Sequence, residues 1–296
     1  MSALGSVLVA GLLLGGIYSL VAIGLNLIFG VIRVVNFAQG EFVMLGMYAT
    51  LVAYNTLGID PYLALPIVIP VLFLLGMAVQ RLILQRLQNE PTMQIFATFG
   101  LLMLLQNLVL AATGGANYSI RSPVSALILP LGPVQVSVSR LVALLAACLV
   151  AAGLHWGLRH TMAGKAVRAV AQDRRAARLM GIDVEQTYMY TFGLGAALAG
   201  VAGALLAPIY TLSPQIGGNF ILAAFAVVVL GGLGSVGGAF IGGLLIGITE
   251  ALAGYYLDPA LKQTVWFMIF IAVLVFRPTG LFGLAGAEEM GLRTQE

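Results

Sequence analysis

The stretch "SVLVAGLLLGGIYSLVAIGLNLIFG", residues 6–30, is an apolar run of 25 residues without a charged side chain. About 20 apolar residues suffice for a helix to cross the ~30 Å hydrocarbon core of a membrane, because each residue adds about 1.5 Å. No basic residue precedes the run, whereas a cleavable signal peptide begins with a basic region. The stretch therefore predicts a transmembrane helix that is retained in the protein.

Eight further apolar segments follow this one along the chain. The segment 219–232 is short for a full crossing, so it is either a complete span or a half-helix buried in protein. We therefore predict an all-α, polytopic transmembrane helical bundle with eight or nine membrane segments, which form a single domain over residues 1–296. The nine segments are 6–30, 37–57, 62–80, 93–112, 140–158, 188–209, 219–232, 236–255 and 262–277.

The distribution of charge predicts the orientation in the membrane. The chain is 60% hydrophobic and 8% charged, whereas about a quarter of the residues in a soluble domain carry charge. Lys and Arg concentrate in the loop 159–178, which the positive-inside rule places in the cytoplasm. The loop 114–139 is then external and the C-terminus cytoplasmic, while the N-terminus lies outside with nine crossings and inside with eight. This rule explains the net charge of +3 without a nucleic-acid partner.

Few residues suit metal or nucleotide chemistry. Cys148 is the single cysteine, and the two histidines, His155 and His160, lie near one membrane edge, so no clustered metal site is predicted. The stretch "GLRHTMAGKA" lacks the spacing of a phosphate-binding loop, and Ala166 occupies the position of the required Ser or Thr. We expect no cofactor on this chain, and any ATP that drives it on another chain.

Three polar residues interrupt the apolar pattern between the first two segments. The stretch "RVVNFAQGEF", residues 33–42, contains Asn36, Gln39 and Glu41. They either line the inner mouth of a translocation path or cap the second helix, with Asn36 as its N-cap. The residues themselves leave both alternatives open.

Other polar residues lie inside predicted spans. Glu250 interrupts an apolar run, and a charged side chain at the centre of a span costs about 3 kcal/mol on insertion scales. It lines a path, or it is protonated or hydrogen-bonded to a neighbouring helix. Gln106 and Asn107 are candidates for the path or for hydrogen bonds between helices.

Small residues recur at four-residue spacing. Gly234, Gly238 and Gly242 form one series, and Gly195, Ala199 and Gly203 form another. Such spacing lets helix backbones approach closely, either within one bundle or at a subunit interface. In both cases the helices are expected to pack tightly.

The polar segment 161–187 is expected to be helical. Thr161 is a suitable N-cap, and Gly181 is a suitable residue to end the helix. One side is apolar (Val167, Val170) and the other basic (Arg168), which is typical of a solvated connector or of a helix that docks in a partner's groove.

Several stretches together resemble one family, the inner-membrane permease subunits of ABC importers for branched-chain amino acids and related solutes. They are distributed over nearly the whole chain in the family's order, although relatives commonly have His where this chain has Gln39. That departure puts in doubt any role that depends on a titratable imidazole. The stretches are "GGIYSLVAIGLNLIFGVIRVVNFAQGEF", "GKAVRAVAQDRRAARLMGI", "FGLGAALAGVAGALLAP", "VVLGGLGSVGGAFIGGLLIG" and "FRPTGLFG".

The resemblance implies a multi-pass protein of the bacterial inner membrane that performs no covalent chemistry. It implies that a periplasmic binding protein delivers the solute, that two permease subunits form the path, and that two cytoplasmic ATPases bind and hydrolyse ATP. It makes Asn36, Gln39 and Glu41 a family signature, and 161–187 the loop that couples to an ATPase. The residues expected in this coupling are Gly164, Lys165, Arg168, Asp173, Ala176, Ala177 and Gly181.

Alternatives remain for the substrate and for the class of transporter. Within the family, urea, short amides and aromatic or other carboxylic acids are alternatives to branched-chain amino acids. A different class is a proton-coupled secondary transporter in which Glu250 and Glu41 carry protons. An intramembrane enzyme has little support, because the sequence has no paired carboxylates or nucleophile motif.

Overall fold

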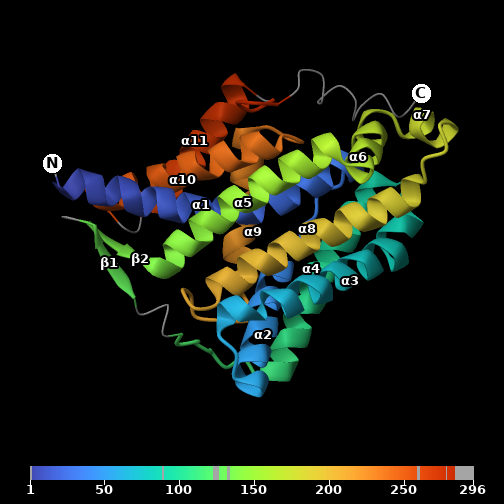
Figure 1. The fold of residues 1–296 in the computed structure, drawn as a ribbon. Helices are drawn as coiled ribbons and strands as arrows, with labels where there is room; N and C mark the ends of the chain where they lie inside the picture. Colours follow the sequence, from blue (N-terminus) through green and yellow to red (C-terminus); the bar gives the residue numbers. More distant parts are fainter. Residues whose placement is uncertain are drawn as a thin grey trace.

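A computed structural model describes residues 2–88, 90–122, 127–131, 134–258, 261–277 and 279–283. Apart from one small hairpin and an isolated bridge between Tyr118 and Leu212, the regular secondary structure of the described residues is helical (Figure 1). The helices are α1 (Ser2–Ile32), α2 (Gln39–Leu57), α3 (Leu65–Leu82), α4 (Pro91–Thr113), α5 (Val138–His160), α6 (Met162–Gln172), α7 (Arg174–Leu179), α8 (Val184–Leu206), α9 (Ile216–Gly231), α10 (Val236–Tyr256) and α11 (Lys262–Phe276), with 3-10 turns η1 (Pro61–Ala64) and η2 (Leu84–Leu87) on either side of α3.

Each of the nine predicted apolar segments coincides with one of these helices, which confirms an all-α polytopic architecture. Among the described residues, six helices are long and apolar enough to cross a membrane: α1, α3 with its flanking turns, α4, α5, α8 and α10. The helices α9 and α11 are apolar but shorter, and Gln39 and Glu41 make the start of α2 polar. The predicted count of eight or nine crossings is therefore not confirmed.

The predicted external loop contains a short antiparallel hairpin, which the all-α prediction did not include. Strands β1 (Ile128–Leu131) and β2 (Val134–Ser137) pair with Ile128 opposite Ser137. The hairpin lies near the start of α1, at the opposite end of the bundle from α6 and α7 (Figure 1). This arrangement agrees with the alternative in which the N-terminus is external.

The centre of the bundle is held by glycine contacts between neighbouring helices. A Cβ atom on Gly15 of α1 would lie 2.6 Å from the Cα of Leu244 in α10, and one on Gly11 would lie 2.7 Å from the Cα of Ile248. On the other side of α1, helix α8 packs against α2, where a Cβ on Gly46 would lie 2.8 Å from the Cα of Gly200. Only glycine allows backbones to approach this closely.

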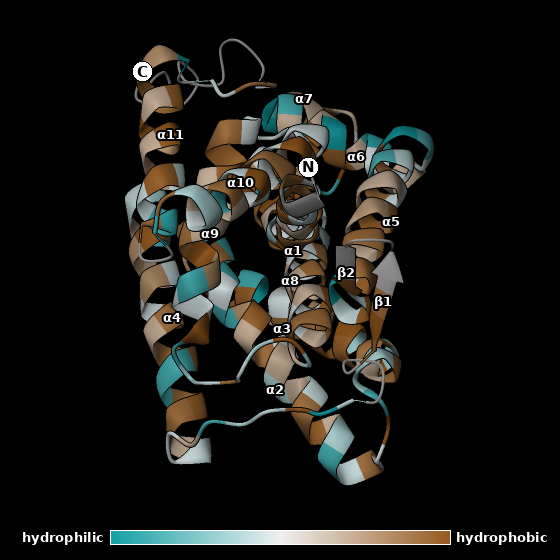
Figure 2. Ribbon diagram, turned by 90° about the vertical axis from the view of Figure 1, so that its left-hand side faces the viewer, coloured by the Kyte–Doolittle hydropathy of each residue, from teal (hydrophilic) through white to brown (hydrophobic). Residues whose placement is uncertain are grey.

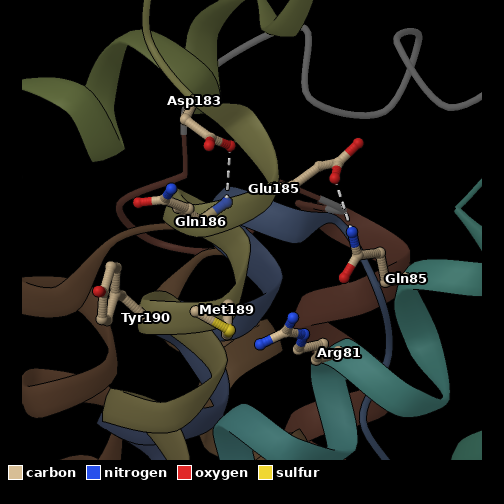
Figure 3. A pocket seen from close by; sticks show the side chains of 7 residues that line it. All are labelled: Arg81, Gln85, Asp183, Glu185, Gln186, Met189 and Tyr190. Carbon is tan, nitrogen blue, oxygen red and sulfur yellow. Dashed lines mark hydrogen bonds between the residues drawn. The ribbon is translucent and has the colours of Figure 1, made fainter.

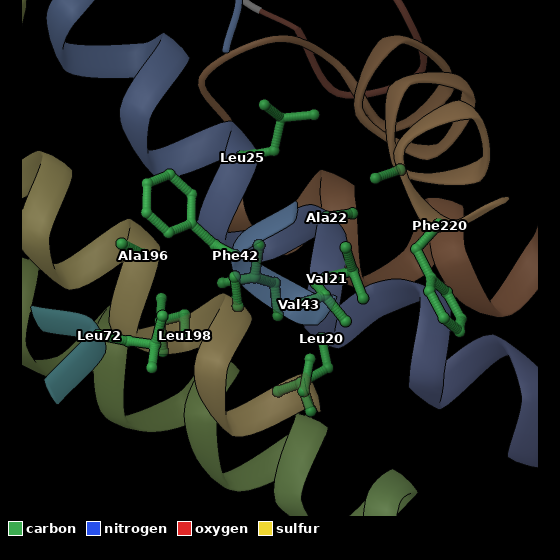
Figure 4. Packing of buried hydrophobic residues seen from close by; sticks show 14 of the residues in the cluster. Leu20, Val21, Ala22, Leu25, Phe42, Val43, Leu72, Ala196, Leu198 and Phe220 are labelled. Atoms are coloured by element: carbon green, nitrogen blue, oxygen red, sulfur yellow. The ribbon is translucent and has the colours of Figure 1, made fainter. Parts of the chain in front are cut away.

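Large side chains fill the space around these contacts. Phe42 of α2 is fully buried and packs edge-on against Phe192 of α8, with 6.0 Å between the ring centroids. Figure 4 shows Phe42 next to Ala196, one turn further along α8. Helix α8 thus lies in the interior of the molecule, whereas α4 and α5 are largely exposed.

The predicted series Gly234, Gly238 and Gly242 divides among several contacts. Gly238 and Gly242 of α10 face Gly231 of α9, so they close the α9–α10 hairpin. Gly234 precedes α10, has a φ of +83° and faces Gly30 of α1. The series therefore spans a turn and a helix, and it contacts two different neighbours.

Candidate functional site

Asn36, Gln39 and Glu41 of the 33–42 stretch are enclosed by the bundle. Helix α1 ends at Ile32, and Arg33 adopts a left-handed φ of +60° that redirects the chain. Asn36 and Gln39 are fully buried, and the Nδ2 of Asn36 donates to the Oε1 of Gln39 over 3.2 Å. Gln39 in turn donates through Nε2 to the carbonyl oxygen of Gly195 in α8, at 3.2 Å. These amides connect the α1–α2 turn to the central helix.

The interpretation of Asn36 as the N-cap of α2 is wrong. Ala38 occupies that position, and no side chain caps the helix. The Oδ1 of Asn36 instead accepts from the backbone N–H of Ala38 at 3.1 Å, two residues ahead, as in an Asx turn. The turn therefore uses Asn36 to satisfy its own backbone before the helix begins.

Glu41 lies where the first turns of α2 and α9 meet. The backbones of Gly40 and Gly217 are in direct contact, and the Oε1 of Glu41 lies beside Gly217. The side chain is 2% exposed, and its Oε2 has no hydrogen-bond partner among the described residues. A buried acceptor without a partner is unfavourable, so this position suits a group that arrives from elsewhere.

Glu250 is engaged by two side chains. Tyr18 of α1 donates its hydroxyl to Oε2 at 2.7 Å, and the Nζ of Lys262, at the start of α11, lies 3.3 Å from Oε1. The carboxylate is 4% exposed and links three helices. This geometry favours a structural role over a path residue, because both oxygens have partners.

Gln106 and Asn107 lie on α4 away from these clusters. Asn107 is exposed, and its Nδ2 donates to the carbonyl oxygen of Met103 in its own helix at 2.8 Å. One contact of α4 with the α1–α2 turn is made by Thr98, whose hydroxyl donates to the carbonyl of Val35 at 3.1 Å. The structure therefore brings together Asn36, Gln39 and Glu41, with Thr98 as a neighbour that the sequence analysis missed.

The predicted helix of the 161–187 loop is two helices. Thr161 caps α6 by accepting from the N–H of Gly164 at 3.0 Å, as its sequence position suggested. The chain then extends at Asp173 (φ −148°), whose Oδ1 accepts from the N–H groups of Arg175 at 2.7 Å and Ala176 at 3.0 Å. Asp173 thus begins a second helix, α7, and these N–H groups hold the pKa of its carboxyl below the usual value. The last residues of the predicted loop belong to α8.

The two short helices and the residues up to Gly181 form one unit, the α6–α7 unit (162–181). Its inner side packs against the membrane bundle. Gly164 is buried, and a Cβ there would lie 2.6 Å from the Cα of Leu158 in α5. Val170 and Ala177 are buried as well, while Gly181 ends the unit with a φ of +82°. The remaining residues of the predicted coupling set, Lys165, Arg168 and Ala176, are exposed. The set therefore divides into residues that hold the unit in place and residues available to a partner.

The outer tip of this unit is apolar, which the sequence analysis missed. Leu179 and Met180, just before Gly181, are 88% and 82% exposed. Arg174, Arg175 and Arg178 lie in the preceding turns and are also exposed. Figure 2 shows hydrophilic residues gathered on α6 and α7, so this apolar tip projects from a polar surface.

A hydrogen bond connects the α6–α7 unit to the residue that follows α1. The guanidinium of Arg33 donates to the carbonyl oxygen of Ala171 in α6 at 3.0 Å.

A cavity of about 90 Å³ lies between α6, the end of α1 and the start of α10, with Arg168, Asn26 and Gly234 in its lining. The buried Asn26, a second residue missed by the sequence analysis, accepts from the N–H of Gly234 at 2.6 Å and donates to the carbonyl of Ser235 at 2.7 Å. These bonds fix the start of α10 to α1, next to the cavity that α6 borders.

Comparisons with known proteins give a consistent result along the chain. A family model described as "Branched-chain amino acid transport system / permease component" matches residues 7–274. The high-affinity branched-chain amino acid transport system permease protein LivH of Salmonella typhimurium is 33% identical over 296 residues, which cover 95% of this chain and 96% of that protein. The corresponding protein BraD of Pseudomonas aeruginosa is 32% identical over 302 residues, which cover 96% and 97%.

A third relative comes from another organism. The probable branched-chain amino acid transport permease protein LivH of Methanocaldococcus jannaschii is 33% identical over 289 residues, which cover 90% of this chain and 88% of that protein. No solved structure matches the chain significantly.

Proposed function

The chain belongs to the family of branched-chain amino acid transport permease components, and from this premise we propose that it carries branched-chain amino acids as one membrane subunit of an ATP-driven importer. Family membership makes it a transport protein of the inner membrane rather than an enzyme. The substrate is proposed because three relatives that match nearly the whole chain are described as branched-chain amino acid permeases. The proton-coupled alternative is not favoured.

The proposal includes partners that supply energy and substrate. A second permease, identical or homologous, completes the path, two cytoplasmic ATPases bind ATP, and a periplasmic binding protein delivers the amino acid. This chain itself binds no cofactor in the proposal. The observation that carries the ATPase contact is the exposed apolar pair Leu179 and Met180, presented at the tip of a helical unit whose inner side is fixed to the bundle.

The contacts suggest how ATPase closure reaches the path. A force on α7 passes to α6, and from Ala171 to Arg33 at the end of α1. Arg33 is followed directly by the turn in which Asn36 and Gln39 hold α8, and then by Glu41 at the contact of α2 with α9. Movement of α1 relative to α8 would therefore change the surroundings of the unpaired Glu41 oxygen, which we propose lines the path.

Copurification from mild detergent tests the proposal. We expect the tagged wild-type chain to retain an ATPase and a second permease. The double variant Leu179→Asp/Met180→Asp should lose the ATPase, because two carboxylates replace the apolar anchor, but it should retain the second permease. Met162→Asp is the matched control, since Met162 is 79% exposed at the other end of the unit.

Two results would contradict the proposal. The first is a wild-type chain that purifies without an ATPase and still transports amino acids in liposomes with a proton gradient alone. The second is equal ATPase recovery from the double variant and the wild type, which would place the docking surface elsewhere.

A further inference from the structure

A second cavity opens where the cytoplasmic ends of α3 and α8 meet. Its volume is about 390 Å³, within the range of small-ligand sites. Figure 3 shows the side chains around it, with Arg81 and Gln85 on one side and residues of the first turns of α8 on the other. Asp183, Glu185 and Gln186 belong to the last part of the predicted coupling loop 161–187, but they lie beyond Gly181, which ends the α6–α7 unit, and none of the lining residues belongs to the proposed transport path.

Charges of opposite sign face this cavity without neutralising each other. Arg81 lies on one side, and Asp183 and Glu185 lie on the other. Within the part of the chain that the structure describes, no ion pair within 4.0 Å joins Arg81 to either carboxylate. The cavity therefore leaves room for a molecule that carries both charges.

Each carboxylate also has a defined orientation. The Oδ1 of Asp183 accepts from the N–H of Gln186 at 2.9 Å and so caps α8, and the Oε2 of Glu185 accepts from Gln85 at 2.7 Å. These bonds hold the two side chains at the rim, and each uses one carboxylate oxygen. The other oxygen is available to a cation at the mouth of the cavity.

The charges are arranged in order of depth. Asp183 and Glu185 stand at the cytoplasmic start of α8, whereas Arg81 lies in the last turn of α3, before Gln85 in η2, and is therefore deeper in the membrane. Met189 and Tyr190, further along α8, border the cavity at the level of Arg81 (Figure 3). An anionic group would therefore bind Arg81 in the inner part of the cavity, and a cationic group would bind Asp183 and Glu185 at its rim.

Exposed apolar side chains continue from Arg81 into the membrane. Leu74 is 62% exposed, seven residues before Arg81 on the same face of α3, and Leu194 is exposed one turn beyond Tyr190 on α8. Phe73 stacks on Tyr190 with 6.4 Å between the ring centroids, so α3 and α8 are joined at this level. The cavity is therefore continuous with a surface that suits hydrocarbon chains.

We propose that this cavity binds the zwitterionic headgroup of an inner-leaflet phospholipid, with the phosphate at Arg81 and the ammonium at Asp183 and Glu185. In such a lipid the phosphate lies nearer the acyl chains and the amine lies further out, which is the order of the charges in the cavity. An Arg guanidinium binds phosphate through two parallel hydrogen bonds. A free amino acid has both charges but no acyl chain for Leu74 and Leu194. The inference requires the membrane location only, not the ATP-driven cycle.

Native mass spectrometry of the purified complex can test the site. Phosphatidylethanolamine, phosphatidylcholine, phosphatidylglycerol and free leucine are titrated separately. Phosphatidylethanolamine should bind most tightly, because its ammonium has N–H donors for the carboxylates, which phosphatidylcholine and phosphatidylglycerol lack. Arg81→Gln should weaken it about tenfold, the scale of a lost charge-assisted hydrogen bond. Arg86→Gln is the matched control, since Arg86 is exposed at the same membrane edge but does not line the cavity.

A second variant separates the two halves of the site. Glu185→Gln should reduce the preference for phosphatidylethanolamine over phosphatidylcholine and leave phosphatidylglycerol binding unchanged, because only the ammonium contact is weakened. Equal lipid affinity in Arg81→Gln and Arg86→Gln would overturn the proposal. Displacement of the lipid by free leucine would overturn it as well, because the ligand would then be a soluble zwitterion. Recovery of the ATPase with each variant is recorded separately, so a failure of the importer assignment is distinguished from a failure of the lipid site.

Discussion

Individual polar residues in this chain differ mainly in whether the fold gives them partners. Glu250 and Glu41 both interrupt apolar sequence, and both are almost completely buried. Glu250 receives a tyrosine and a lysine, whereas one oxygen of Glu41 receives no partner among the described residues. The sequence pattern could not separate them, because Tyr18 is 232 positions away from Glu250 in the chain.

The Glu250 cluster gives a prediction about stability. Lys262→Gln should lower the free energy of unfolding by about 2 kcal/mol, because it leaves a buried carboxylate with Tyr18 as its remaining partner. Glu250→Gln should also destabilise the protein, and the double variant should lose less than the sum of the two single variants. Thermal unfolding in detergent measures all three. Strict additivity would show that the two side chains do not interact.

The positions of the helices can be predicted closely from the sequence, whereas their ends can be predicted less closely. The apolar segments predict nine helices at nearly the observed positions, because a backbone in hydrocarbon must satisfy its hydrogen bonds internally. The break at Asp173 was missed because good helix formers surround it, although Asp is also a preferred N-cap. The hairpin β1–β2 was missed because short strands in a loop carry a weak pattern.

At the level of helix pairs, the contact of α1 with α10 gives a second stability prediction. Gly15→Val should destabilise the protein by about 3 kcal/mol, because a Cβ there would lie 2.6 Å from the backbone of Leu244. Gly5→Val is the control in the same helix, since a Cβ at Gly5 would meet nothing within 4 Å. Thermal unfolding and the yield of folded protein compare the two variants. Similar losses in both would mean that helix propensity, and not the close contact, determines the effect.

At the scale of the whole molecule, the α6–α7 unit is joined to buried polar residues through the end of α1. Arg33 is central to this connection, because it both redirects the chain and contacts α6. From the sequence, a basic residue at this position is explained by the positive-inside rule alone. The contact with Ala171, 138 positions away, becomes visible only in the folded chain.

Loss of the Arg33 contact should uncouple transport from ATP hydrolysis. In the assembled importer, Arg33→Gln should leave the ATPase bound but reduce the amino acid transported per ATP hydrolysed, because α6 no longer holds the end of α1. Transport and phosphate release measured in the same proteoliposomes give this ratio. Arg86→Gln should leave it unchanged. An unaltered ratio in Arg33→Gln would show that the force travels by another route.

The sequence by itself determined the membrane location, the helical segments and the family, and it predicted a cytoplasmic loop at 161–187. Hydropathy and the positive-inside rule depend on local composition, and each stretch that resembles the family is continuous in the sequence. Only the tertiary structure decided which helices touch, which buried polar groups have partners, and that charges from α3 and α8 share a cavity. The physical reason is that these outcomes depend on close packing between segments far apart in the chain, and apolar side chains of similar hydropathy do not specify their neighbours.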